Sequence, residues 1–336
     1  MIECGFGAES PEPICTCEHS MEEHPLHRRK ALMLFAVIVV TWGLNWLVTK
    51  TLVHSTPPLW TTSIRSAIAT VALLLLLLAR GQFIIPRRGD VPVIVAIAML
   101  HMVGFSALVA FGLQFVPVGR SVVLGYTTPL WVTPGAWLFL REPLTRSRAA
   151  GVGLGLLGLV VMFNPLAFDW GNRDGLIGNG LILLAAFCWA ANILYVRAHK
   201  WISTPFQLVF WQTLLATSIL SILALVFDGP PRIEWDPRIA AAFLYAGIFG
   251  TALAYWAMAM VNRSLPAVTT SLGILATPVI GVISSAVVFG EPISLSLLVA
   301  MALILTGIAV GAIPRTIAIR SRRGLGSDRR LAQAGE

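Results

Sequence analysis

Two aromatic and amide pairs at the same spacing are the residues best suited to bind a small polar solute. Trp42 precedes Asn45 by three residues, and Trp189 precedes Asn192 by the same interval. Residues three apart share a helix face, so each pair presents a flat apolar wall beside a group that donates and accepts hydrogen bonds. We expect both faces to line a central cavity. The alternative is that each asparagine only ties neighbouring helices together.

A cation and an imidazole lie within apolar stretches. Arg65 is a candidate partner for a substrate carboxylate, because a charge inside hydrocarbon is costly and is usually functional. Its long stem could instead extend to the outer headgroups, since it lies only seven residues after Pro58. His101 could bind substrate or carry a proton, or could be a hydrogen-bonded structural residue.

Prolines interrupt two of the apolar stretches at positions flanked by hydroxyl groups. Pro129 and Pro278 each remove a backbone donor and free a carbonyl one turn earlier. Thr128 and Thr277, directly before these prolines, would add hydroxyls to a substrate site, or would only repair a kinked helix. Tyr255 could line the same path, although aromatic residues are also ordinary packing material.

The composition places these residues in a membrane. The 336-residue chain is 57% hydrophobic and 12% charged, with a mean hydropathy of +0.80, which excludes an ordinary soluble globular domain. Stretches such as Val71 to Ala79 do not alternate apolar and polar residues, so the spans are helices rather than strands of a barrel. The ten expected spans are 31–51, 58–80, 91–115, 119–140, 147–164, 176–197, 204–227, 238–261, 266–289 and 295–313.

The second half of the chain echoes the first. One set of residues recurs after 147 positions and another after 149. The pairs are Trp42 and Trp189, Asn45 and Asn192, Pro58 and Pro205, Pro129 and Pro278, Glu142 and Glu291, and Pro143 and Pro292. Five helices is an odd number, so the second copy would enter the membrane in the opposite orientation, giving inverted repeats and alternating access.

Basic residues predict the orientation. The connection 141–148 contains three arginines, whereas its repeat equivalent, 290–294, contains no basic residue. Because basic residues are retained in the cytoplasm, we expect both termini to be cytoplasmic. Glu142 and Glu291 would then lie at opposite surfaces, where each begins a structural turn and Thr145 or Ser294 caps the next helix.

The expected organisation is two repeats with short flanking segments. Cysteines and histidines occur near the N-terminus, but we expect a disordered tail there rather than a metal site, and no cofactor is expected. The segments are a cytoplasmic tail (1–30), the first five-helix repeat (31–165), an external linker (166–175), the second five-helix repeat (176–313) and a basic cytoplasmic tail (314–336).

At residues 31–313 the chain resembles the drug/metabolite transporter superfamily, specifically its ten-helix EamA-type members. The resemblance rests on Trp42-Gly43-Leu44-Asn45, Arg65, Pro129, Arg141-Glu142-Pro143-Leu144 and Glu291-Pro292. It implies an all-α integral membrane protein of two inverted repeats in a bacterial inner membrane, similar to exporters of amino acids and related metabolites. Gln212 stands where Arg65 would repeat.

The residues favour a carrier of small neutral or zwitterionic solutes such as amino acids. No Asp or Glu lies in the middle of a span, which disfavours proton exchange through a buried carboxylate, and one Arg with one His is a thin complement for multiply charged sugar phosphates. A drug or nucleoside-type permease is the alternative. A membrane-embedded enzyme is disfavoured by the lack of paired carboxylates or nucleophile and base pairs. Proton or counter-solute coupling stays open, and no nucleic-acid partner is expected.

Overall fold

A computed structural model describes residues 26–163, 172–231 and 233–312 of the chain. Every regular element in these residues is a helix, and no strand occurs among them. The predicted tails lie largely outside the described residues, as does most of the predicted linker, although helix already begins at Arg28 and at Arg173. The expected all-helical fold is therefore confirmed for the described part of the chain.

Proline and capping residues fix where most helices in the first half begin. Pro58 is the first residue of α2, and Pro117 directly precedes α5, positions at which the missing N–H costs nothing. The bounds are α1 Arg28–Ser55, α2 Pro58–Ala79, η1 Arg88–Asp90, α3 Val91–Ile97, η2 Ala98–Phe105, α4 Ser106–Phe115, α5 Val118–Gly125, α6 Thr128–Phe139 and α7 Arg146–Phe163. The stretch Arg88–Phe115 is one continuous helix whose middle, η2, is a π-helix.

The second half repeats this order of elements. The bounds are α8 Arg173–Ala198, α9 Pro205–Phe227, α10 Pro237–Leu244, η3 Tyr245–Leu253, α11 Ala254–Ser264, α12 Ala267–Gly273, α13 Ala276–Phe289 and α14 Leu295–Gly311. The second π-helix, η3, begins 147 residues after the first, which is the offset of the tryptophan and asparagine pairs. The hydroxyl of Ser294 accepts the Leu297 N–H at 3.2 Å and that of Thr145 accepts the Arg148 N–H at 3.3 Å, which confirms both predicted caps.

Within the described ranges, seven helices are long and apolar enough to cross a membrane. They are α1, α2, Arg88–Phe115, α7, α8, α9 and Pro237–Asn262, and each coincides with an expected span. The expected span at 119–140 is divided into α5 and α6, the one at 266–289 is divided into α12 and α13, and the last falls on the shorter α14. The count of ten spans therefore stays a prediction.

The two divided helices are broken directly before the prolines that the sequence singled out. Pro129 lies in the first turn of α6, after a turn at Tyr126 and Thr127. The Thr128 hydroxyl donates to the Gly125 carbonyl at 2.8 Å and lies 3.3 Å from that of Ala186. The carbonyl left without a helical partner is therefore satisfied locally, as hydrocarbon requires.

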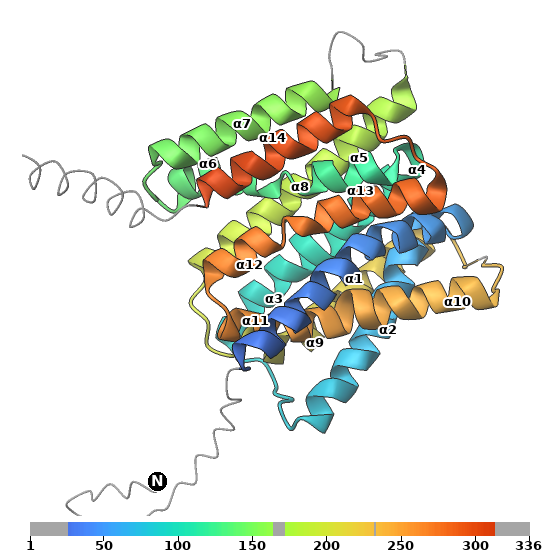
Figure 1. The fold of residues 1–336 in the computed structure, drawn as a ribbon. Coiled ribbons are helices and arrows are strands. Elements are labelled where there is room, and N and C mark those ends of the chain that lie inside the picture. The colour runs from blue at the N-terminus through green and yellow to red at the C-terminus, as the bar shows by residue number, and fades with distance from the viewer. Residues whose placement is uncertain (1–25, 164–171, 232, 313–336) are drawn as a thin grey trace, which may run out of the picture.

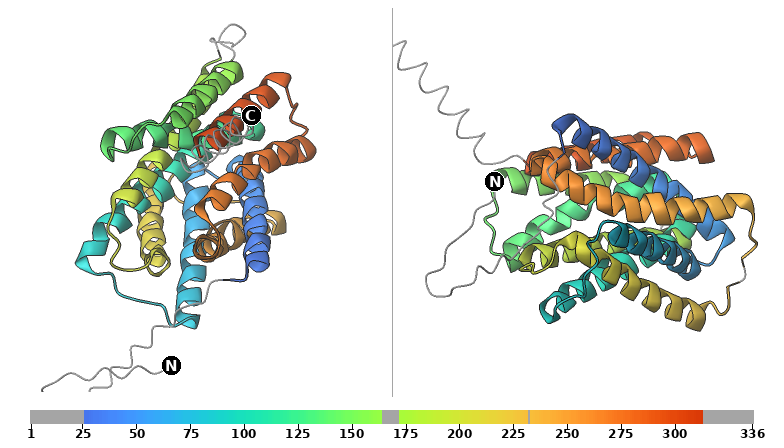
Figure 2. Two further views of the ribbon diagram at one scale, coloured as in Figure 1. Left: turned by 60° about the vertical axis from the view of Figure 1, so that its left-hand side comes forward. Right: turned by 90° about the horizontal axis from the view of Figure 1, so that it is seen from below.

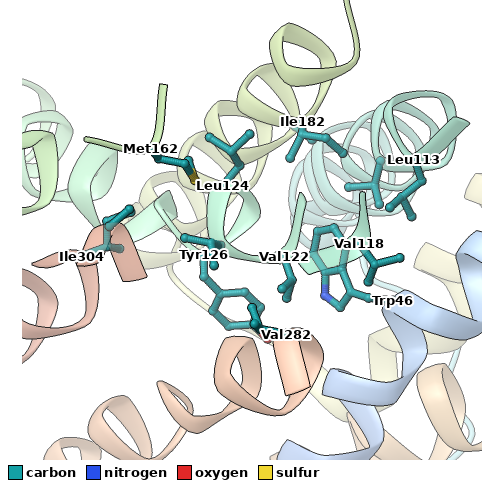
Figure 3. Packing of buried hydrophobic residues seen from close by; sticks show 14 of the residues in the cluster. Trp46, Leu113, Val118, Val122, Leu124, Tyr126, Met162, Ile182, Val282 and Ile304 are labelled. Carbon is teal, nitrogen blue, oxygen red and sulfur yellow. The ribbon is translucent and has the colours of Figure 1, made fainter. Parts of the chain in front are cut away.

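Helices pack closely both at one edge of the molecule and in its core. Figures 1 and 2 show α7 and α14 side by side along one edge of the molecule. Between the halves, Trp46, Val122, Tyr126 and Val282 belong to one buried cluster (Figure 3). At Gly281 of α13 an added Cβ would lie 3.0 Å from Val122 of α5, so these two helices pack with little space between them.

Gly151 tests the packing of α7 on α14. A Cβ at Gly151 would lie 2.4 Å from the Gly307 carbonyl oxygen, a backbone atom that cannot move aside, so Gly151→Ala should cost about 1–3 kcal/mol of unfolding free energy. Denaturant unfolding in mild detergent measures it. Gly153→Ala is the matched control in the same helix, because nothing lies within 4 Å of its added Cβ. Equal stability of the two variants would contradict the packing.

Candidate substrate cavity

A cavity of about 540 Å³ lies between the two halves of the chain. It is lined by residues of α1, α2, α8, α9, both π-helices and the helices that follow them. Seven of the nine predicted substrate-binding residues line it: Trp42, Asn45, Arg65, His101, Trp189, Asn192 and Tyr255. The structure therefore gathers into one place residues that are up to 213 positions apart in the sequence.

Thr128 and Thr277 do not belong to the cavity lining. Both are buried, at 1% and 0% exposure, in the layer behind it. The Thr277 carbonyl instead lies 3.1 Å from the position that a Cβ on Gly43 would take, where α13 approaches α1. Their expected part in substrate binding stays a prediction, and the geometry gives them a packing role.

The cavity opens toward one end of the bundle. Its lining extends to Trp201, Pro205 and Asn262, which lie near the end at which α1 begins. The connections from α1 to α2, from α4 to α5 and from α13 to α14 at the opposite end contribute no lining residue among those the structure describes. Toward that closed end α5 packs against α13, whereas α6 and α12 lie apart at the end where α1 begins (Figure 1).

Arg65 brings a positive charge to the cavity without an acidic companion. Within the described residues no Asp or Glu contributes to the lining, and no ion pair reaches Arg65. Tyr126, Tyr255 and His101 are the other ionisable side chains among the lining residues that the structure describes. A guanidinium presents several N–H donors in a rigid fork, so the site is prepared for a group that accepts hydrogen bonds and carries negative charge.

An aromatic wall joins the two halves of the chain beside Arg65. The ring of His101 stacks on Phe105 with centroids 5.5 Å apart and on Trp189 at 5.8 Å. The Tyr255 hydroxyl lies 3.2 Å from Nδ1 of His101, within hydrogen-bond distance. His101 lies within a π-helix, an irregularity that often occurs at functional sites.

Three amide groups in the lining have unused hydrogen-bonding capacity. Oδ1 of Asn45, Oδ1 of Asn192 and Nε2 of Gln212 are buried and meet no hydrogen-bond partner within the described part of the chain. Gly250 makes room for the first of these, because a Cβ there would lie 2.5 Å from Asn45 Oδ1. An unpaired buried polar atom costs about 1–3 kcal/mol, so each of these amides would be stabilised by a polar partner.

Sequence reasoning missed several polar residues of the lining. Thr62, Ser66 and Gln212 were not among the predicted site residues. Gln212 occupies the repeat position of Arg65, and that equivalence was the signal that could have identified it. Among the described residues no cluster of three or more His, Cys, Asp or Glu side chains that could hold a metal ion occurs.

Comparisons with known proteins agree with a two-part membrane chain. The EamA-like transporter family matches it twice, at residues 29–164 and 176–312. The uncharacterized transporter YoaV of Bacillus subtilis is 24% identical over 83% of this chain and 95% of its own. A probable amino-acid metabolite efflux pump of Salmonella typhimurium is 28% identical over 84% of this chain and 94% of its own.

A solved crystal structure supports the arrangement of the helices. It has a TM-score of 0.60 with this chain, covering 88% of this chain and 99% of the solved one, at 21% sequence identity. At that identity the likeness shows the fold alone.

Met258 tests the direction in which the cavity opens. In a chain whose cysteines are replaced by serine, Met258→Cys should react with a membrane-impermeant thiol reagent only from the side that labels Lys30→Cys, because Met258 lines the open part of the cavity. Ser55→Cys, at the other end of α1, marks the opposite side. Labelling in vesicles of both orientations measures this, and equal labelling of Met258→Cys from both sides would overturn the geometry.

Proposed function

Because this chain belongs to the EamA-like transporter family, within the drug/metabolite transporter superfamily, we propose that it carries small neutral or zwitterionic metabolites, such as amino acids, by alternating access. The chain is a multi-pass membrane protein and a transporter rather than an enzyme. The observation that carries the proposal is one cavity between the two matched halves, with a single arginine, unpaired amides and aromatic walls.

We propose that ten spans form two inverted five-helix repeats, 31–165 and 176–313, joined by an external linker. The support is the matching order of elements, including a π-helix in the third long helix of each half and a divided helix after it. The ends of the described chain also lie on one side of the molecule, where α1 begins and α14 ends (Figure 1). The density of arginines on that side supports a cytoplasmic location for both termini, and we propose that the membrane is a bacterial inner membrane.

The chemistry of the lining matches the parts of an amino acid. Arg65 supplies donors for the carboxylate, while the amide oxygens of Asn45 and Asn192 and the faces of Trp42 and Trp189 can receive an ammonium group. His101 and Tyr255 border the same space, and the aromatic wall would contact an apolar side chain. One cation neutralises one carboxylate, which suits a zwitterion better than a sugar phosphate.

The open end of the cavity supports export. If the end where α1 begins is cytoplasmic, the structure has its site open to the cytoplasm and closed to the outside, ready to load an internal solute. A relative of similar length is named a probable amino-acid metabolite efflux pump, which agrees with that direction. Coupling to a proton or to a counter-solute belongs to the same proposal, with His101 as the one imidazole among the described lining residues.

Counterflow in proteoliposomes tests the substrate class. Labelled amino acids, nucleosides and cationic drugs would be offered to the purified full chain, and amino acids with apolar side chains should accumulate. Accumulation of nucleosides alone would favour the permease alternative, for which the stacked aromatic wall is the supporting feature. Accumulation of no solute in the panel would overturn the proposed substrate class.

Arg65→Gln should weaken transport of a carboxylate-bearing solute about tenfold to a hundredfold, because a charge-assisted hydrogen bond in a desolvated site is lost. The same solute with its carboxylate converted to an amide should be transported equally by both proteins. Arg88→Gln is the matched control, since Arg88 is exposed and does not line the cavity. If Arg65→Gln leaves the half-saturating concentration of the carboxylate-bearing solute unchanged, Arg65 does not bind that solute.

A further inference from the structure

We infer that Glu291 and Lys50 together form a latch that holds the outer end of the transporter closed, and that transport requires its release. The inference rests on the proposed alternating access. Both residues lie at the end of the bundle opposite the cavity opening, and neither belongs to the cavity lining. The sequence predicts only a structural turn at Glu291. In the structure its carboxylate also bonds to a helix of the other half.

The carboxylate of Glu291 binds the beginning of α5. Its Oε1 accepts the Val118 N–H at 2.8 Å, and its Oε2 accepts the Gly119 N–H at 2.9 Å. These N–H groups belong to the first turn of a helix, where they have no helical acceptor and where the helix dipole favours negative charge. Glu291 follows α13, so these bonds join the second half of the chain to the first.

Lys50 binds the connection that leads from α4 into α5. Its Nζ donates to the carbonyl of Leu113, in the last turn of α4, and to that of Val116 at 3.2 Å. The connection between α4 and α5 is thus bound by a cation from α1 at the helix that ends and by an anion at the helix that begins. The opposite charges of Lys50 and Glu291 also attract each other.

These contacts tie together the helices whose packing closes the outer end. An added Cβ on Gly119 would lie 3.1 Å from the Ser285 hydroxyl oxygen of α13, so α5 and α13 already touch directly below the latch. Separating α5 from α13 would pull both backbone N–H groups away from Glu291. The carboxylate has space to swing aside, because Glu291 also lines a hollow of about 200 Å³.

The repeat equivalent of Glu291 is engaged differently. Glu142 accepts from Arg148 Nη1 at 3.0 Å and from Arg197 Nη2 at 2.5 Å, at the open end of the bundle. It binds side chains rather than the start of a helix. Two carboxylates in equivalent sequence positions therefore have unequal contacts at the two ends of a molecule that is closed at one end and open at the other.

Cysteine accessibility tests the latch without needing a substrate. In the cysteine-free full chain, Ser285→Cys reports on the space below the latch and Met258→Cys on the cavity opening. Glu291→Gln keeps the shape of the side chain but removes its charge and one acceptor. We expect it to raise labelling of Ser285→Cys by an impermeant thiol reagent about tenfold and to lower labelling of Met258→Cys at least twofold. Glu142→Gln, the matched control, should leave the Ser285→Cys rate unchanged.

Opposite changes in the labelling of Ser285→Cys and Met258→Cys distinguish a latch from a contact that only stabilises the fold. A merely structural role would lower thermal stability while leaving Met258→Cys labelling unchanged, and that outcome would overturn the inference, as would an unchanged Ser285→Cys rate. If Glu291→Gln does not fold, Lys50→Met must give the same reciprocal change. If the latch inference is wrong, solute counterflow is still observed. If the proposed substrate class is wrong, both labelling rates can still be measured, so the two failures are distinguishable.

Discussion

A backbone polar group without a partner is costly in hydrocarbon, and the structure depends on how this chain satisfies such groups where its helices are irregular. Two helices are divided directly before Pro129 and Pro278, and the long helix before each break contains a π-helix. Threonines repair several of these positions: Thr127 donates to Leu124 O at 2.7 Å, and Thr251 donates to Ala246 O at 2.8 Å in η3. Both π-helices and the turn at Tyr126 contribute residues to the cavity lining.

The distribution of charge follows from the same constraint. Asp90 is fully buried, but the N–H of Ser203 at 3.2 Å and its hydroxyl at 2.8 Å satisfy the carboxylate. Glu142 and Glu291 are likewise bound by donors at the two ends of the bundle. Arg65 contrasts with these groups because its surroundings supply no carboxylate among the described residues. We propose that the solute supplies the carboxylate that pairs with Arg65.

Residue type and spacing predicted the long apolar helices and seven of the residues that line the cavity. The repeated tryptophan and asparagine pairs identified facing helices, and the length of the apolar stretches identified the long spans. The π-helices could not be predicted, since His101 is the one polar side chain in η2 and a single polar position cannot reveal a change in helical period. A proline marks a break, but not the direction in which the neighbouring hydroxyl points, so Thr128 was expected in the cavity and lies behind it.

The central claim is that one cavity is exposed to the two sides of the membrane in turn. Ser106 lines it deep between the halves, so Ser106→Cys in the cysteine-free chain is the most direct probe. During solute exchange in sealed vesicles of defined orientation, an impermeant thiol reagent should label it from either side, and saturating solute should slow both rates. Labelling from the side of Lys30 alone, with or without solute, would contradict alternating access.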